Sequence, residues 1–260
     1  MEVKLYSGAG NTFVVLDGRQ EVLHLDVQAL CKSYSTDGLM LLKSAEGYDF
    51  AMEYYNSDGS GGMMCGNGGR CIVAFARDCG ILPSDGKTYH FLAPDGEHFA
   101  YLLPDGNIRL KMIDVKDFHP AVDEGWFLDT GTRHYVQFVP DTEVLDIEKT
   151  GAYYRHLSDF APIGVNANFV QRLAPDTIRV RTFEKGVEAE TLACGTGITA
   201  SALACCLKDL ASEGEQEGAV VQERHFKVQA RKDILEVEYR FDGHSFTEVY
   251  LTGPAVEYSL

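Results

Sequence analysis

The chain has 260 residues, of which 45% are hydrophobic, and it carries 23 Lys and Arg against 39 Asp and Glu, a formal net charge of −16. This length is long for one hydrophobic core and suits two lobes of ordinary domain size. The negative charge, with no block of Lys or Arg, opposes binding to a phosphate backbone and argues against a nucleic-acid-binding protein.

The elements predicted in chain order are mostly short strands. Aromatic and β-branched residues fill the apolar runs, and turn sequences such as Pro94-Asp95-Gly96 and Asp242-Gly243 separate them, which is typical of hairpins. Helices are predicted over about 26–34, 67–79 and 196–211. Strands are predicted over residues 48–55, 90–93, 98–103, 108–112, 126–129, 134–139, 168–173, 177–183, 234–241 and 246–251. A boundary between two lobes is expected near residues 112–118.

Two short motifs are alike and stand before two of these helices. MMCGNGGRC, residues 63–71, and LACGTGITAS, residues 192–201, each place Cys-Gly-x-Gly directly before an apolar helical pattern. Cys65 and Cys194 are too far apart in the sequence for local pairing. The repeat therefore predicts two structurally equivalent half-sites with one thiol in each.

The start of a helix is a chemically specific place for a thiol. It lies at the positive end of the helix dipole beside unpaired backbone N–H groups, which lowers a thiol pKa from its usual value of about 8.5. The glycines let backbone N–H groups approach an anion closely. Two such helix starts facing each other would hold one carboxylate between two thiols. That arrangement predicts removal of a proton from one face of an α-carbon and return of a proton to the other.

The remaining cysteines lack this setting and are interpreted as core or helix-packing residues; they are Cys31, Cys71, Cys79, Cys205 and Cys206. The N-terminal residues MEVKLYSGAGNTFVVLD show no secretory signal, and the apolar stretch from Ile198 to Leu207 is too short to span a bilayer. An odd number of cysteines without such a signal favours reduced thiols, so we expect a cytoplasmic protein without a membrane partner.

The residues around the two motifs resemble a known family. NSDGSGGMMCGNGGRC (56–71) and FEKGVEAETLACGTG (183–197) resemble the two signature segments of the diaminopimelate epimerases, and GAGNTFVVLD (8–17) resembles their N-terminus. The resemblance implies an α+β fold of two pseudo-symmetric lobes, each a curled antiparallel sheet around a central helix, with the site between the lobes. It implies an N-terminal lobe of residues 1–115, joined by about 250–260, and a C-terminal lobe of residues 116–249.

The same resemblance implies an isomerase. It would interconvert LL- and meso-2,6-diaminopimelate for the synthesis of lysine and peptidoglycan precursors, with two cysteines as acid and base. Neither a cofactor nor a metal is expected. The expected partner is a small amino-acid substrate, and a homodimer is the assembly considered.

The resemblance also assigns roles to single residues of this chain. Cys65 and Cys194 match the two acid–base thiols, while Gly66, Asn67, Gly195 and Thr196 match the cradle of the reacting carboxylate. Side-chain amides on the substrate are matched by Asn11, Asn56 and Asn166, with Asn168 as the alternative to Asn166. Glu184 matches an acid near the substrate and His134 a histidine near one thiol, both expected to tune thiol pKa values.

Two departures from the family pattern fall on substrate recognition. Thr132-Arg133-His134 stands where the family usually has Asn-Pro-His, and Glu184-Lys185-Gly186 stands where it usually has Glu-Arg-Gly. The family arginine would clamp the distal carboxylate, and Lys185 offers a point charge instead of a planar fork. Arg133 could supply the missing fork. These departures do not change the expected reaction type. They leave the identity of the substrate open, and the alternative is a related two-thiol racemase that acts on another amino acid.

Other classes of function are also open at this stage. Residues 195–200 fit the dinucleotide fingerprint G-x-G-x-x-A, but the hairpin-rich context argues against a nucleotide-dependent oxidoreductase. A zinc site at Cys65 and Cys71 lacks the usual ligand spacing. A cysteine hydrolase, with Cys65 or Cys194 as nucleophile and His134 as base, would leave the second motif unexplained. A non-catalytic binding protein of the same fold is the remaining alternative.

Overall fold

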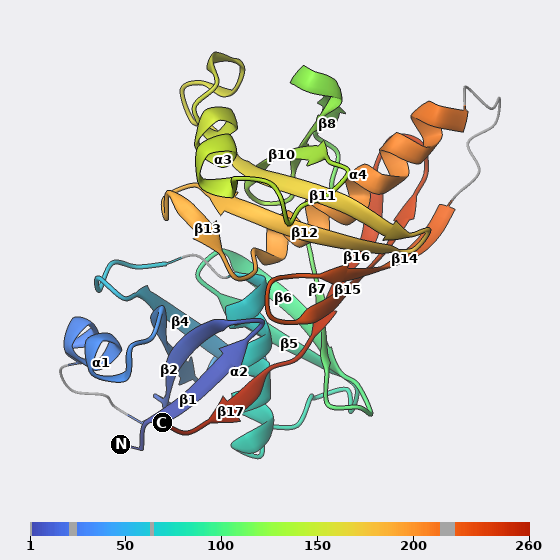
Figure 1. The fold of residues 1–260 in the computed structure, drawn as a ribbon. Helices are drawn as coiled ribbons and strands as arrows, with labels where there is room; N and C mark the ends of the chain where they lie inside the picture. Colours follow the sequence, from blue (N-terminus) through green and yellow to red (C-terminus); the bar gives the residue numbers. More distant parts are fainter. Residues whose placement is uncertain (1, 21–24, 63–64, 214–221) are drawn as a thin grey trace. The chain divides into compact units, whose positions relative to one another are not determined.

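The structure is a computed structural model that describes residues 2–20, 25–62, 65–213 and 222–260 (Figure 1). The chain divides into two compact units, the first made of residues 1–111 and 252–260 and the second of residues 112–251. Each unit contains a mixed sheet, and in each unit one long helix packs against several strands.

The first unit consists of β1 (Lys4–Gly8), β2 (Asn11–Asp17), α1 (Val27–Tyr34), β3 (Gly38–Lys43), β4 (Phe50–Asn56), α2 (Gly66–Asp78), β5 (Thr88–Ala93), β6 (Gly96–Leu102), β7 (Ile108–Lys111) and β17 (Val256–Tyr258). The second consists of β8 (Phe118–Pro120), β9 (Trp126–Asp129), β10 (Arg133–Phe138), α3 (Ile147–Arg155), β11 (Asn166–Ala174), β12 (Thr177–Glu184), β13 (Ala189–Thr191), α4 (Gly195–Glu213), β14 (Gln222–Gln229), β15 (Ile234–Phe241) and most of β16 (Phe246–Gly253), with 3-10 turns at Val122–Glu124 and Ser158–Phe160.

The two units repeat one plan of strand pairing. From β1 through β6 the successive neighbours pair antiparallel, parallel, antiparallel, parallel and antiparallel. The same order recurs in the second unit from β9 through β10, β11, β12 and β14 to β15. A parallel pair needs a long crossover, and α1, α2, α3 and α4 each lie in one of these crossovers. In this repeat α2 corresponds to α4.

The predicted α+β class with two pseudo-symmetric lobes is confirmed. The expectation of antiparallel sheets is incomplete, because each unit also contains parallel pairs. Sequence turn signals reveal hairpins, which are antiparallel, whereas a parallel pair leaves no local signal. The C-terminal β17 pairs antiparallel with β1, which brings the end of the chain into the first unit.

Every predicted strand coincides with an observed strand, and the three predicted helices are α1, α2 and α4. The helix α3 was not predicted. Its sequence IEKTGAYYR contains Thr150, Gly151 and two tyrosines, all weak helix formers. Gly151 is required by packing, because a Cβ at this position would lie 2.2 Å from Cβ of Phe183. The available signal was Asp146, which caps the helix by accepting from the Lys149 N–H.

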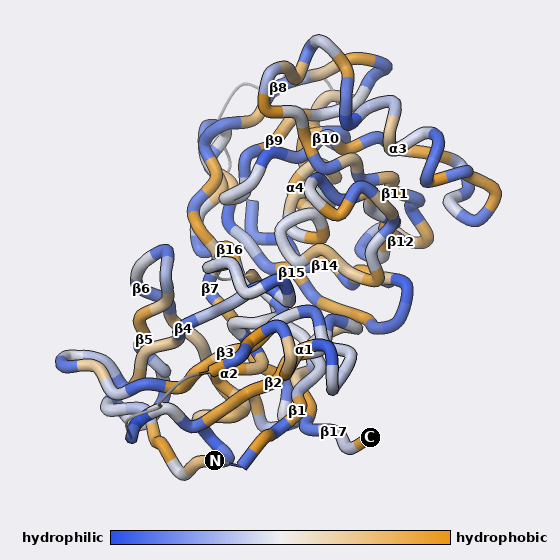
Figure 2. Tube along the Cα trace, turned by 90° about the vertical axis from the view of Figure 1, so that its left-hand side faces the viewer, coloured by the Kyte–Doolittle hydropathy of each residue, from blue (hydrophilic) through white to orange (hydrophobic). Residues whose placement is uncertain are grey.

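The central helices α2 and α4 are buried along most of their length. All residues of α2 from Gly66 to Ala76 are buried, and the helix packs against β1, β2, β3 and β7, of which β2 and β3 are strongly hydrophobic (Figure 2). Helix α4 packs against β9, β10, β11, β12, β14 and β15. Burial on all sides fixes the position of a helix and hence of the residues at its N-terminus.

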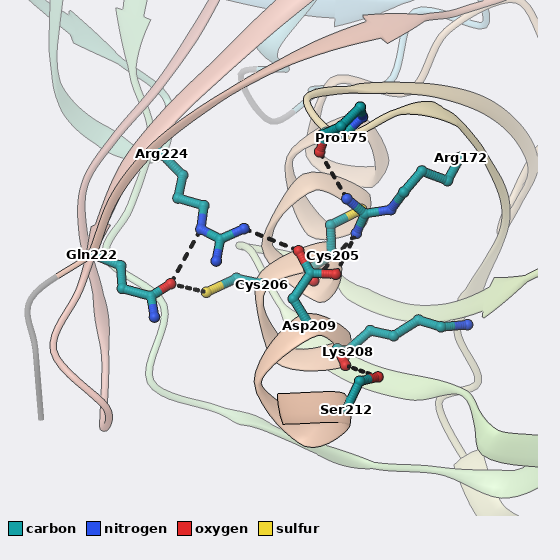
Figure 3. A network of polar contacts seen from close by, with 9 residues as sticks. All are labelled: Arg172, Pro175, Cys205, Cys206, Lys208, Asp209, Ser212, Gln222 and Arg224. Carbon is teal, nitrogen blue, oxygen red and sulfur yellow. Dashed lines mark hydrogen bonds and ion pairs between the residues drawn. The ribbon is translucent and has the colours of Figure 1, made fainter. Parts of the chain in front are cut away.

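Polar contacts fix the far end of α4 to two strands of its own unit (Figure 3). Asp209 binds Nη2 of Arg172, on β11, at 2.8 Å and Nη1 of Arg224, on β14, at 2.9 Å. The same Arg172 guanidinium donates to the carbonyl of Pro175 at 2.8 Å. These contacts hold α4 along its axis, so that its N-terminus is kept in register with the sheet.

Candidate active site

Cys65 caps the N-terminus of α2. Its Sγ accepts a hydrogen bond from the backbone N–H of Gly68 at 3.3 Å, and its carbonyl accepts from the Gly69 N–H at 2.8 Å. The side chain is half-buried. Met63 and Met64, which open the sequence motif, lie outside the described residues. The predicted placement of this thiol at a helix N-terminus is confirmed.

Cys194 has the same place at the start of α4. Its carbonyl accepts from the Ile198 N–H at 2.8 Å, four residues on, as in the first motif. Its Sγ lies 3.4 Å from Oγ1 of Thr196, and the residue is only 8% exposed. The two thiols therefore share a backbone setting but have different neighbours.

The third residue after each cysteine is a glycine, and the space around the two glycines differs. A Cβ on Gly68 would lie 3.4 Å from Sγ of Cys65, an ordinary contact. A Cβ on Gly197 would lie 3.3 Å from Sγ of Cys194 and 2.3 Å from Oδ1 of Asn168. The second motif is thus packed more tightly against its sheet than the first.

A buried arginine supports the Cys65 turn from inside the first unit. Arg70 is 0% exposed, and it donates to the carbonyl of Gly66 at 2.9 Å and to Oδ1 of Asn67 at 2.8 Å. It also donates to the carbonyl of Pro254, at 3.4 Å, near the returning C-terminus. The sequence analysis did not identify Arg70. The available signal was a cation directly before the apolar run of the predicted helix.

The structure brings three of the predicted substrate residues of this unit to one edge of the sheet. Nδ2 of Asn67 donates to Oδ1 of Asn11 at 2.6 Å, and Nδ2 of Asn11 lies 3.4 Å from Oδ2 of Asp37. Asn56 pairs with Gly38, the residue after Asp37, and its Nδ2 donates to Oγ of Ser60 at 3.0 Å. The amides of Asn11 and Asn67 therefore orient each other, while that of Asn56 belongs to an exposed turn.

In the second unit His134 is buried and neutral. It is 0% exposed, its Nε2 lies 2.9 Å from Oγ1 of Thr132, and its Nδ1 lies 3.0 Å from Nδ2 of Asn168. Burial is the main cause that lowers the pKa of His134 to about 3. A histidine that stays uncharged near neutral pH cannot tune a thiol by its charge. Its contacts instead join it to the hydroxyl groups beside Cys194.

Both candidate asparagines of β11 are buried, and the amide of each is engaged within the protein. Asn168 is buried, its Nδ2 donates to the Tyr135 carbonyl at 3.0 Å, and its Oδ1 accepts from Thr182 Oγ1 at 2.9 Å. Oδ1 of Asn166 accepts from the Lys185 N–H at 2.9 Å, and its Nδ2 donates to the Arg133 carbonyl at 3.1 Å. Both amides are therefore bound on both sides, and that of Asn166 holds the backbone of Lys185.

Of the two cationic residues considered, Lys185 is bound to Asn166 through its backbone N–H. Glu184 is the half-buried last residue of β12, and Lys185 follows it. The guanidinium of Arg133 donates to the Phe160 carbonyl at 3.1 Å and lies 5.1 Å from the centre of the Phe127 ring. Successive residues of a strand point to opposite faces, so Arg133 faces away from His134. The hypothesis that Arg133 supplies the missing fork is not supported.

The other thiols are chemically quiet. Cys31, Cys71, Cys205 and Cys206 are buried, and Cys79 is half-buried. Burial raises the pKa of Cys71 and of Cys205 to about 12, which keeps both protonated.

Gly195 to Ala200 follow β13, a short strand antiparallel to β12, whereas a dinucleotide fingerprint follows a buried parallel strand.

Among the described residues no group of three or more His, Cys, Asp or Glu side chains is arranged to hold a metal ion. Within the same part of the chain, no helix has the length and apolar character needed to cross a membrane.

The sequence of this chain is similar to the sequences of known proteins. The family model described as diaminopimelate epimerase matches residues 3–115 and 126–257. A diaminopimelate epimerase from Flavobacterium psychrophilum is 37% identical over 262 residues, covering 98% of this chain and 97% of that protein. One from Chlorobaculum tepidum is 44% identical over 207 residues, covering 76% of this chain and 80% of the relative.

Solved structures show the same fold in more distant proteins. A Bacillus anthracis protein described as a phenazine biosynthesis protein of the PhzF family superposes with a TM-score of 0.74 at 13% identity, covering 100% of this chain and 98% of that one. A probable proline racemase from Agrobacterium radiobacter gives a TM-score of 0.62 at 15% identity, covering 100% and 93%. At this identity the likeness concerns the fold alone.

Proposed function

The chain belongs to the diaminopimelate epimerase family, and from this premise we propose that it interconverts LL- and meso-2,6-diaminopimelate with Cys65 and Cys194 as acid and base. It is an isomerase. The observation that carries the proposal is the pair of cysteines at equivalent helix N-termini, in a chain that matches the family over nearly its whole length. The activity implies a role in making lysine and peptidoglycan precursors in the cytoplasm.

In the proposed reaction each thiol serves one face of the substrate α-carbon. The thiolate of one cysteine takes the α-proton and becomes a thiol, and the electron pair left behind spreads onto the adjacent carboxylate. The thiol of the other cysteine then gives its proton to the opposite face and becomes a thiolate. The configuration is inverted and the two cysteines have exchanged protonation states, so the step needs no oxidant or cofactor.

The helix N-termini supply the electrostatic part of this mechanism. The first backbone N–H groups of a helix have no partner within it, and Gly66, Asn67, Gly195 and Thr196 are the residues that would present them to the reacting carboxylate. Their dipoles stabilise the negative charge that develops there. This stabilisation must contribute to lowering a barrier by an amount on the scale of 8–23 kcal/mol typical of enzymes.

The cysteine hydrolase alternative is weakened by His134. A general base should have a pKa near the working pH, whereas burial holds the pKa of His134 at about 3. Thr132 and Thr196 also stand between its ring and Cys194, since Oγ1 of Thr132 lies 2.9 Å from the ring Nε2 and 3.2 Å from Oγ1 of Thr196. The acid–base role of two thiols needs no such histidine.

The substrate rests on fewer observations than the reaction type. Diaminopimelate has a second carboxylate away from the reacting carbon, and we assign Lys185 to it because Asn166 holds the Lys185 backbone and Arg133 is engaged elsewhere. The second candidate function is a racemase of a monocarboxylic amino acid, which would not need this cation.

The test is incubation of the pure protein with LL-diaminopimelate and with a panel of monocarboxylic amino acids, followed by chiral separation. We expect the meso isomer to appear and the panel to be untouched. Lys185→Ala should raise KM for diaminopimelate about 10- to 100-fold, and Lys185→Arg should preserve it, because a charge-assisted hydrogen bond contributes about 1.5–3 kcal/mol. Inversion of a monocarboxylic amino acid alone would establish the second candidate instead.

A further inference from the structure

The orientation of one buried amide fixes where the proton of His134 lies. Nδ2 of Asn168 is 3.0 Å from the Tyr135 carbonyl and 3.3 Å from the Asn166 carbonyl, and carbonyls can only accept. The third neighbour of this nitrogen is Nδ1 of His134 at 3.0 Å, and because an amide –NH2 only donates, Nδ1 accepts, with the two hydrogens shared among three acceptors. Burial and, to a smaller extent, the charge of Lys185 keep the ring neutral by lowering its pKa to about 3. The single ring proton is consequently on Nε2.

That proton determines what the Thr132 hydroxyl can do. Nε2 of His134 donates to Oγ1 of Thr132 at 2.9 Å. Nδ2 of Asn166 donates to the same oxygen at 3.3 Å, because its amide is oriented by the Arg133 carbonyl and the Lys185 N–H. A hydroxyl accepts two hydrogen bonds and donates one. With both acceptor positions of Thr132 taken, its proton points to the remaining neighbour, Oγ1 of Thr196, at 3.2 Å.

The hydroxyl of Thr196 in turn donates toward the sulfur of Cys194. Its Oγ1 accepts from Thr132, so its own proton is directed at Sγ of Cys194, 3.4 Å away. The backbone of Thr196 is held by the Thr130 hydroxyl, which donates to its carbonyl at 3.0 Å. From His134 to Cys194, every donor in the chain of contacts points toward the sulfur.

We propose that Thr132 and Thr196 are positioning residues that relay hydrogen-bond direction from buried His134 to Cys194 and make the thiolate of Cys194 easier to form. The inference rests on the proposed function only in taking Cys194 as an acid–base residue. A donor directed at sulfur stabilises the charged form. Thr132 is exposed and Thr196 half-buried, so water competes and the effect is moderate.

The first test measures the alkylation of individual cysteines by iodoacetamide at pH 7, with peptide mapping. Only the thiolate displaces iodide, so the rate reports its population. Thr132→Val should slow alkylation of Cys194 about tenfold, the change that one pKa unit produces. Thr132→Ser, which keeps the hydroxyl, should restore it. Cys65 in the same sample is the internal reference, and its rate should stay the same because its sulfur receives a backbone N–H.

The second test asks whether the two hydroxyls act in series. Thr196→Val removes the last donor and should slow Cys194 as Thr132→Val does. In the double variant Thr132→Val should have no further effect, because its contribution passes through Thr196. Unchanged alkylation in Thr132→Val, or slowing that multiplies in the double variant, would overturn the relay. Both tests need no substrate, so failure of the diaminopimelate assay leaves their result readable, and the reverse also holds.

Discussion

The two Cys-Gly-x-Gly turns share a backbone and differ in what supports them. At Cys65 the sulfur receives a backbone N–H from Gly68, and the turn is held from within by the buried cation of Arg70. At Cys194 the sulfur meets the hydroxyl of Thr196, and a neutral network of threonine, asparagine and histidine lies behind it. The repeat therefore preserves the position of the thiol while the two environments have become different.

The difference shows which features the chemistry needs twice. A helix N-terminus with a thiol and a following glycine occurs in both units, and these features belong to the proposed proton transfer. The buried cation of the first unit and the hydroxyl relay of the second are separate solutions to holding such a turn. Two thiols that alternate as base and acid need equivalent positions, not identical surroundings.

The largest expected effect is loss of either thiol. Cys65→Ala and Cys194→Ala should each reduce turnover about 10²- to 10⁴-fold, the usual contribution of one acid–base group, because in the proposed mechanism each thiol serves one face of the substrate. Turnover in the diaminopimelate assay measures this. Cys79→Ala is the matched control, since this half-buried cysteine ends α2, and its activity should match that of the unchanged chain. Near-normal turnover without Cys65 or Cys194 would make that cysteine structural.

The buried cation of the first unit should matter for stability. Arg70→Met removes the donor that serves Gly66, Asn67 and Pro254 and leaves buried acceptors unpaired, at a cost of about 3 kcal/mol in the free energy of unfolding. Arg77→Met on the same helix breaks only a partly exposed pair with Asp78 and should cost less than about 1 kcal/mol. Urea denaturation measures both. Equal losses would show that Arg70 does not brace the turn.

The two glycines should respond unequally to the same change. Gly197→Ala places a Cβ against Oδ1 of Asn168, so the free energy of unfolding should fall by about 1–3 kcal/mol and activity should fall with it. Gly68→Ala makes only ordinary contacts with Cys65 and Met40 and should be tolerated. Thermal or urea unfolding of the two variants gives the comparison, and a reversed order would refute the tighter packing of the second turn.

His134 should give the second unit a sensitivity to acid. Its pKa is about 3 in the folded chain and near 6.5 in the unfolded one, so the unfolded chain binds more protons between these values. Stability from the buried ring is thus fully present above pH 6.5 and falls by about 1.4 kcal/mol for each pH unit below it. Urea denaturation at pH 7.5, 6 and 5 measures the slope. His134→Gln lacks the titrating ring and should flatten it; an unchanged slope would contradict the assignment.

The sequence could predict what repeats or what is local. The paired cysteine motifs, the hairpins marked by Pro-Asp-Gly and Asp-Gly turns, and the starts of α2 and α4 all depend on neighbouring residues. The parallel pairs depend on strands far apart in the sequence, and α3 has a weak helical composition. For these elements the packing of the whole unit determines whether they form.

Within the site the sequence could identify residues but not the directions of the hydrogen bonds between them. The resemblance pointed to His134 near a thiol and to Asn166 as an amide on the substrate, and the structure places both beside Thr132. That His134 is neutral follows from its burial, and that Thr132 donates toward Cys194 follows from amides fixed by distant carbonyls. Arg70 was missed because a buried arginine is recognised by its acceptors, and one of them, the carbonyl of Pro254, is far from Arg70 in the sequence.

The central claim is that each thiol serves one face of the substrate, and the most direct measurement is solvent labelling early in the reaction. LL-diaminopimelate is incubated with the protein in deuterium oxide, and both isomers are analysed by mass spectrometry before much has turned over. The two-thiol mechanism predicts deuterium at the inverted carbon of the meso product and little in the remaining substrate. Equal early labelling of both isomers would show one shared base and would contradict it.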